Sequence, residues 1–202
     1  MRTSVSMAAF AGLLVASAVC AQQPPPAATE VGASLLALLN IPAKAGAPKL
    51  TVTSPAFQAG ADIPFENTQY KGNVFPGLAW TAGPASTKSY VVIMQDGDAM
   101  SRGAPILHWT MINIPGSVTK LDAAMSAPPA GAAYGPNIRG PAMAYMGPRT
   151  PAGPKHRYHF QIFALDTVIP SDGAGTYDAL TGAMKDHVVA SGELVALGQV
   201  AP

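Results

Sequence analysis

The sequence predicts a single domain that is mainly β, built as a sandwich or an open barrel. From residue 50 onwards, short runs rich in β-branched and aromatic residues recur along the chain, which is typical of strands. Clusters of Gly, Pro, Asn and Asp separate these runs, as turns do in an all-β domain. Of the 202 residues 49% are hydrophobic and only 11% are charged, so the chain can bury a core.

The N-terminal residues 1–21 have the composition of a secretory signal peptide. One early Arg2 precedes an uncharged stretch over residues 7–19, and small residues end the segment at Ala21. The stretch is shorter than the roughly 20 residues that a membrane-spanning helix needs, so we expect no transmembrane segment. We expect cleavage after Ala21 and a periplasmic or secreted mature protein that starts at Gln22.

Cys20 is the one cysteine of the chain and leaves an alternative open. It would be the acylated first residue if the protein were a lipoprotein. The preceding residues 17–19 lack the Leu and the small final residue that such signals prefer, so we favour plain cleavage. The mature chain would then have no disulfide, no thiol nucleophile and no thiolate metal site.

Each element is expected from its local pattern. Residues 22–48 form a Pro- and Ala-rich N-terminal segment, with one or two helical turns at 34–39 that end at Ile41-Pro42, because a residue before Pro is pushed out of the α region. The domain itself is expected over residues 49–202, with strands at 50–53, 89–94, 106–114 and 158–165. A helix is expected at 178–189, closed by Ser191-Gly192 and followed by a last strand at 193–200. Its apolar face would hold Leu180, Ala183, Met184, His187 and Val188.

The charge balance excludes one class of function. Twelve Lys and Arg stand against eleven Asp and Glu, and no basic cluster appears. We therefore expect no nucleic-acid binding.

Two carboxylates follow an apolar run at the end of an expected strand. Asp96 and Asp98 stand two residues apart in Gln95-Asp96-Gly97-Asp98, and a continuing strand would point both to the same side. Asp and Gly are also turn residues, so spacing alone favours a solvated turn.

Histidines mark two further places. His108 lies in a run too apolar for a surface loop, so its imidazole needs a carboxylate, a backbone group or a ligand as partner. A core histidine with a satisfied hydrogen bond is an equal alternative. After a Gly- and Pro-rich loop, His156, Tyr158 and Phe160 share one face of a strand. Because Pro restricts a loop and Gly lets backbone approach closely, this loop is a candidate anion cradle.

An ordered set of motifs resembles one known family over about residues 50–195. The motifs are Ser54-Pro55-Ala56-Phe57, Leu78-Ala79-Trp80, Asp96-x-Asp98-Ala99, His108-Trp109, Asn113-Ile114-Pro115, Gly147-Pro148-x-x-Pro151-x-Gly153, His156-Arg157-Tyr158 and Ala164-Leu165-Asp166. Together they resemble the phosphatidylethanolamine-binding protein (PEBP) family, and more narrowly its bacterial branch, often called Raf kinase inhibitor-like.

The resemblance implies a β-sandwich with a few short peripheral helices and a small pocket for phosphate-like anions, including phospholipid head groups. It implies no catalytic residue, no cofactor and no metal. Imidazoles and a phenol suit such a ligand, because they hydrogen-bond to anionic oxygens while carboxylates fix the imidazole tautomer. The implied ligand-binding residues are Asp96, Asp98, His108, Gly147, Pro148, Pro151, His156 and Tyr158.

The sequence departs from the family pattern at one motif. Where the family has Asp-Pro-Asp-Ala-Pro, this chain has Asp96-Gly97-Asp98-Ala99-Met100, so both stiffening prolines are missing. We expect a less rigid pocket. His187 also resembles a histidine of the bacterial branch, and its alternative role is a helix-end histidine interacting with the macrodipole.

The leading hypothesis is a secreted, non-catalytic protein of this family that binds a small anionic ligand such as phosphate or a phospholipid head group. One alternative is a protein-interaction module that inhibits a kinase or protease, with a protein partner. Another is a hydrolase that uses Asp and His, with or without a metal. No Ser or Cys stands in a nucleophile motif, and no His-Glu-x-x-His occurs.

Overall fold

The computed structural model describes residues 29–200, without the side chains of residues 171 and 172. The expected signal peptide at 1–21, Cys20 and the cleavage site before Gln22 lie outside the described residues.

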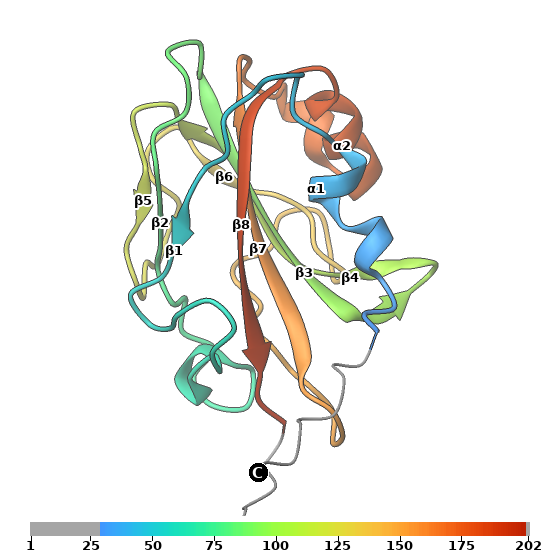
Figure 1. Cartoon of the computed structure of the whole chain (residues 1–202). Helices are drawn as coiled ribbons and strands as arrows, with labels where there is room; N and C mark the ends of the chain where they lie inside the picture. Colours follow the sequence, from blue (N-terminus) through green and yellow to red (C-terminus); the bar gives the residue numbers. More distant parts are fainter. Residues whose placement is uncertain (1–28, 201–202) are drawn as a thin grey trace, which may run out of the picture.

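Two antiparallel sheets form the frame of the molecule. The larger has the strand order β6-β4-β3-β7-β8, and the smaller has the order β1-β2-β5. Figure 1 shows the small sheet on one side of the large one and the helices α1 and α2 on the other. The expected mainly β fold with a few short peripheral helices is confirmed.

The elements have the following bounds. The large sheet consists of β3 (Ser89–Ser101), β4 (Ala104–Pro115), β6 (Ala133–Tyr134), β7 (His156–Leu165) and β8 (Val188–Gly198), and the small sheet of β1 (Val52–Thr53), β2 (Leu78–Trp80) and β5 (Lys120–Leu121). The α-helices are α1 (Ala37–Asn40) and α2 (Tyr177–Met184), and 3-10 turns cover Ala33–Leu35, Phe65–Asn67 and Ser171–Ala174.

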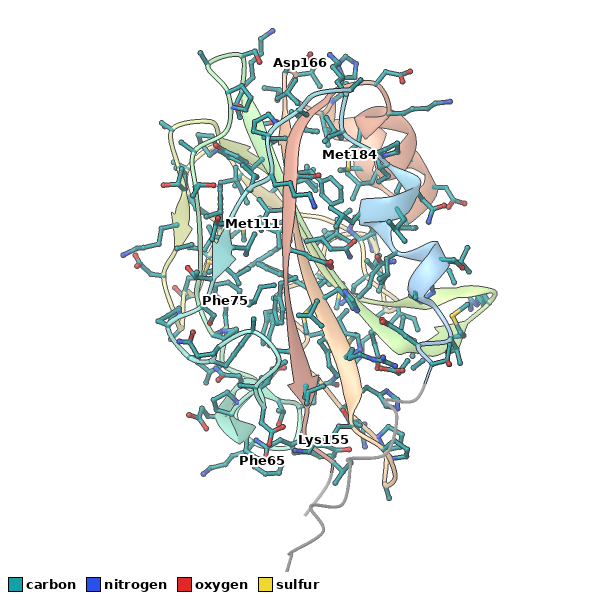
Figure 2. The ribbon with its side chains drawn as sticks, in the orientation of Figure 1. Phe65, Phe75, Met111, Lys155, Asp166 and Met184 are labelled. Carbon is teal, nitrogen blue, oxygen red and sulfur yellow. The ribbon has the colours of Figure 1, made fainter. Side chains whose placement is uncertain are left out.

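The large sheet is covered on both faces, so its central strands are apolar on both. Successive side chains of β3 alternate between two hydrophobic cores. One core lies between the sheets, where Figure 2 shows Phe75 and Met111, and the other lies under the helices, where Met184 of α2 packs. Ala37 and Ile41 of the N-terminal segment also belong to this second core.

Two expectations about element ends are wrong. The strand expected at 89–94 continues to Ser101, so Asp96 does not begin a solvated turn but is only 3% exposed. The helix expected at 178–189 ends at Met184, because Lys185 leaves the helical region with a φ of −55° and a ψ of 136°. Asp186 follows with a left-handed φ of 65°, and β8 begins at Val188.

Ser191-Gly192 was expected to close this helix, and that expectation is wrong. Both residues lie inside β8, which pairs with β7 along its whole length and ends at Gly198 rather than at residue 200. A Cβ on Gly192 would lie 2.0 Å from the backbone oxygen of Leu50. Glycine at this position therefore allows a close chain approach and does not end a helix. The helical turns expected at 34–39 are confirmed, and α1 ends before Ile41.

Candidate functional site

Three neighbouring strands bring most of the predicted polar side chains to one end of the large sheet. Asp96 of β3 pairs in register with Tyr158 of β7, and β4 carries His108 on the other side of β3. His156 is the first residue of β7. In Figure 2 this end of β7 is marked by Lys155, and Asp166 marks the opposite end.

A buried carboxylate orients His156. Nδ1 of His156 lies 2.8 Å from Oδ2 of Asp96, and their side chains are 15% and 4% exposed. A carboxylate only accepts, so Nδ1 donates this hydrogen bond. Oδ1 of Asp96 accepts a second bond of 2.9 Å from the backbone N–H of Asp98. The carboxylate is thus held in place, and Nε2 of His156 has no hydrogen-bond partner among residues 29–200.

A β-bulge positions His108. Met94 pairs with Trp109 and Gln95 with Leu107, so His108 has no partner of its own on β3. Bulges re-aim side chains and are frequent beside active sites. Here the bulge turns the His108 ring edge-on to Tyr158, with centroids 5.0 Å apart.

The hydrogen bonds of His108 identify its neutral tautomer. Nδ1 lies 3.1 Å from the backbone oxygens of both Met146 and Gly147. Carbonyl oxygens only accept, so Nδ1 carries the proton. Burial lowers the pKa of His108, although nearby Asp96 and the two carbonyls act against it. His108 is therefore neutral at pH 7, and within the described chain its Nε2 lone pair has no hydrogen-bond partner.

Tyr158 remains a phenol. It is fully buried, and both burial and the charge of Asp96 raise its pKa. Its oxygen accepts a 3.3 Å bond from the backbone N–H of Arg149 and lies 3.3 Å from Oγ1 of Thr150. Tyr158 therefore anchors the loop that precedes β7.

The Gly- and Pro-rich loop is fixed by a segment that sequence reasoning missed. Gly147 donates its N–H to Oδ1 of Asn73 at 2.7 Å, and Gln69 donates from Nε2 to the Gly147 oxygen at 2.7 Å. A Cβ on Gly147 would lie 2.2 Å from the backbone oxygen of Asn67. Glycine at this position thus allows two backbone segments of the chain to pack closely against each other. In the sequence, Gly72-Asn73 signals only a turn.

The two prolines of the predicted site have different surroundings. Pro148 is buried beside Gly147, and its oxygen accepts a 2.9 Å bond from the Gln69 N–H. Pro151 is exposed. The structure therefore places Pro148, but not Pro151, in the packed part of the loop.

Asp98 does not join the Asp96–His156 pair. Its Oδ2 accepts 2.8 Å bonds from the backbone N–H and from Nε of Arg157, and the guanidinium also contacts Oδ1. Burial opposes ionisation of Asp98, but the hydrogen bonds and charge of Arg157 outweigh it and lower the pKa. The expectation that both carboxylates face one side is wrong, because regular pairing of β3 with β7 ends at Asp96 and pairing with β4 shifts beyond it.

His187 lies far from these residues. Its Nδ1 is 2.8 Å from Oδ1 of Asp166, at the opposite end of β7 from His156 (Figure 2). It follows the end of α2 and pairs with a carboxylate, so it is not part of the helix that was expected to hold it.

Two features are absent from the described part of the chain. Between residues 29 and 200, no group of three or more His, Cys, Asp or Glu side chains is arranged to hold a metal ion. No helix in that range is long and apolar enough to cross a membrane.

The described chain thus combines a β-sandwich with an Asp-backed histidine and a second histidine beside a Gly-Pro loop. The family model described as "Phosphatidylethanolamine-binding protein" matches residues 53–199. The chain belongs to this family.

Relatives and solved structures agree with this assignment. The chain is 32% identical to a UPF0098 protein of Methanothermobacter thermautotrophicus over 73% of this chain and 97% of that protein. It is 33% identical to the UPF0098 protein YbcL of Escherichia coli over 85% and 98% of the two chains. The crystal structure of YbcL covers 76% of this chain and 99% of its own, with a TM-score of 0.67 at 27% identity. That of CT736, a PEBP homologue from Chlamydia trachomatis, covers 75% and 97% with a TM-score of 0.67 at 29% identity.

Proposed function

We propose that this protein binds a small anionic ligand with a phosphate-like group at His108 and His156 and carries out no reaction of its own. One observation carries the proposal: both imidazoles use Nδ1 for a bond within the protein, and in each Nε2 has no partner among the described residues. The family name points to the same chemistry, since phosphatidylethanolamine carries a phosphate diester.

The protonation of His108 determines how such a ligand binds. A neutral Nε2 accepts a hydrogen bond and repels a charged phosphate oxygen, whereas an imidazolium donates a charge-assisted bond to it. Binding the anion therefore favours protonation of His108 and raises its pKa from the value that burial has lowered. Oδ2 of Asp96 accepts from His156 and Oδ1 from the backbone N–H of Asp98, so this carboxylate fixes the orientation of the His156 ring.

The test is thermal melting with inorganic phosphate and with phosphorylethanolamine at pH 6 and pH 8. Proton uptake on binding makes affinity fall as pH rises, so stabilisation should be larger at pH 6. At ten times Kd the ligand contributes about 1.4 kcal/mol, or a few degrees in Tm. His108→Ala and His156→Ala should remove the shift, whereas His187→Ala, at the far end of β7, should keep it. A Tm that neither anion changes at either pH value contradicts the proposal.

We also propose that the protein is exported, on the composition of residues 1–21. Intact-mass analysis of protein from its own host tests this. A mass equal to that of a chain starting at Gln22 supports plain secretion. A mass that includes a diacylglycerol on Cys20 would place the protein on a membrane surface.

A further inference from the structure

The segment before and including α1 crosses the helical side of the large sheet, and we call residues 29–40 the strap. Figure 1 shows it in blue, beside the β3–β4 hairpin and next to α2. Its backbone is bound to the sheet at three places. Gly32 donates its N–H to the Gly97 oxygen at 2.8 Å, and the N–H groups of Ala37 and Leu38 donate to Oε1 of Gln95 and Gln161 at 2.8 and 2.6 Å.

The carboxylate of Glu30 binds the start of the strap to β7. Oε1 of Glu30 lies 2.6 Å from Nε2 of His159, and Oε2 lies 3.7 Å from Nε of Arg157. A Cβ on Gly97 would lie 1.5 Å from Oε1 of Glu30. The room for this carboxylate thus exists because residue 97 has no side chain, at a position where the resemblance predicted a proline.

His159 is placed between two carboxylates. On its other side, Nδ1 lies 2.8 Å from Oε2 of Glu193 on β8, and the residue is only 5% exposed. Both ring nitrogens donate only in the imidazolium form. A neutral ring has one N–H, so it loses one of the two bonds and turns a lone pair toward a carboxylate. The cluster therefore binds the strap most strongly when His159 is charged.

The remaining charges around His159 do not replace this bond. Arg157, two residues earlier on β7, is always charged, bonds to Asp98 of β3 and lies 3.7 Å from Glu30, so its attraction for Glu30 does not change with pH. Gln95 of β3 and Gln161 of β7 are neutral. Although burial opposes the charged form of His159, the hydrogen bonds and charges of Glu193 and Glu30 raise its pKa above 6.5.

The strap also forms one wall of a cavity next to the candidate site. Thr29 and Val31 line a space of about 410 Å³ together with Asp98, His156 and Arg157. Displacing the strap would therefore open the protein surface beside His156.

We propose that the strap is a pH-dependent wall of this cavity, latched by Glu30, His159 and Glu193 and loosened when His159 loses its proton. The latch is complete below pH 6.5 and is lost as the pH rises through the raised pKa of His159. Only the consequence for ligand access rests on the proposed function, since the latch itself involves neither His108 nor His156.

The test is amide hydrogen exchange of the full mature protein without ligand, from pH 5.5 to 8.5, corrected for intrinsic exchange rates. The protection of the Gly32, Ala37 and Leu38 amides should fall about tenfold relative to the amides inside β7. In Glu30→Gln and in His159→Gln the fall should shrink to less than about threefold. His187→Gln is the matched control, because it removes a histidine–carboxylate pair far from the strap.

Protection that does not change with pH in the unmodified protein overturns the inference, and so does an unchanged fall in Glu30→Gln. Glu30 lies outside the two hydrophobic cores, so this variant keeps the test valid if His159→Gln does not fold. A parallel titration with inorganic phosphate separates the two proposals. A strap that opens in a protein that binds no phosphate refutes the proposed function alone, and phosphate binding with a pH-independent strap refutes the latch alone.

Discussion

His108 and His159 show how neighbouring groups determine the charge of a buried histidine. Both are about 5% exposed or less, yet the pKa of His108 is lowered and that of His159 is raised. His108 donates to two neutral carbonyls, so desolvation dominates, whereas His159 lies between two carboxylates that stabilise its charge. His108 therefore favours the neutral form, and His159 the charged form.

At the residue scale, the packing of Gly147 yields a stability prediction. Gly147→Ala would place a Cβ 2.2 Å from the Asn67 oxygen, and backbone on both sides must then shift. We expect a loss of about 1–3 kcal/mol in the free energy of unfolding, measured with urea. The control is Gly182→Ala in α2, where a Cβ meets nothing within 4 Å. It should raise stability by up to about 1 kcal/mol, since alanine favours helix. Equal effects of the two substitutions would contradict this account of Gly147.

At the scale of elements, β3 continues to Ser101 through the segment where a turn was expected, and the strap packs against this part of it. The oxygen of Gly97 accepts the Gly32 N–H, and a Cβ on Gly32 would lie 3.1 Å from Sδ of Met100. The two positions where prolines are missing thus contact the strap. Gly97 and Met100 thus form part of the surface on which the strap packs.

This docking predicts that residues 30 and 97 are energetically coupled. Gly97→Ala puts a Cβ into the space of the Glu30 carboxylate, and we expect it to cost about 1–3 kcal/mol of unfolding free energy. In a Glu30→Ala background the same substitution should cost much less, because the clashing atoms are gone. Urea unfolding of the two single variants and the double variant measures the coupling. Additive costs would show that the two residues do not share this contact.

On the scale of the whole molecule, the two buried histidines change the free energy of unfolding in opposite directions with pH. His108 lowers it toward acid pH, and His159 lowers it toward alkaline pH. The pKa of His159 is raised on folding, so its contribution is complete below pH 6.5 and is lost as pH rises through the folded value. The pKa of His108 is lowered, so the unfolded chain takes up a proton first and stability falls as the pH drops below 6.5.

Urea unfolding between pH 5 and 8.5 should therefore show a maximum. His159→Gln should flatten the alkaline side and leave the acid side, and His108→Gln should do the reverse. Each unit of pKa difference corresponds to about 1.4 kcal/mol. A curve whose two slopes both survive in both variants would assign the pH dependence to other groups.

Several features of the fold and site follow from local sequence pattern. Alternating β-branched and aromatic runs specify strands, and the spacing of His156 and Tyr158 places them on one face of β7, since side chains in a strand repeat every two residues. The ordered motifs identified the family, which the comparisons confirm. The strands and the alternation of their side chains depend on a few neighbouring residues, and the family assignment depends on the order of the motifs along the chain.

The remaining features depend on contacts between residues far apart in the sequence, so they appear only in the folded chain. The bulge at His108 arises from the register of β4 on β3, and no local pattern distinguishes it from regular alternation. Asp96 and Asp98 separate because each meets a different residue of β7 about 60 positions away. Glu30 reaches His159 across 129 positions of sequence. Local propensity cannot specify such pairs, since burial and hydrogen bonding in the folded chain select them.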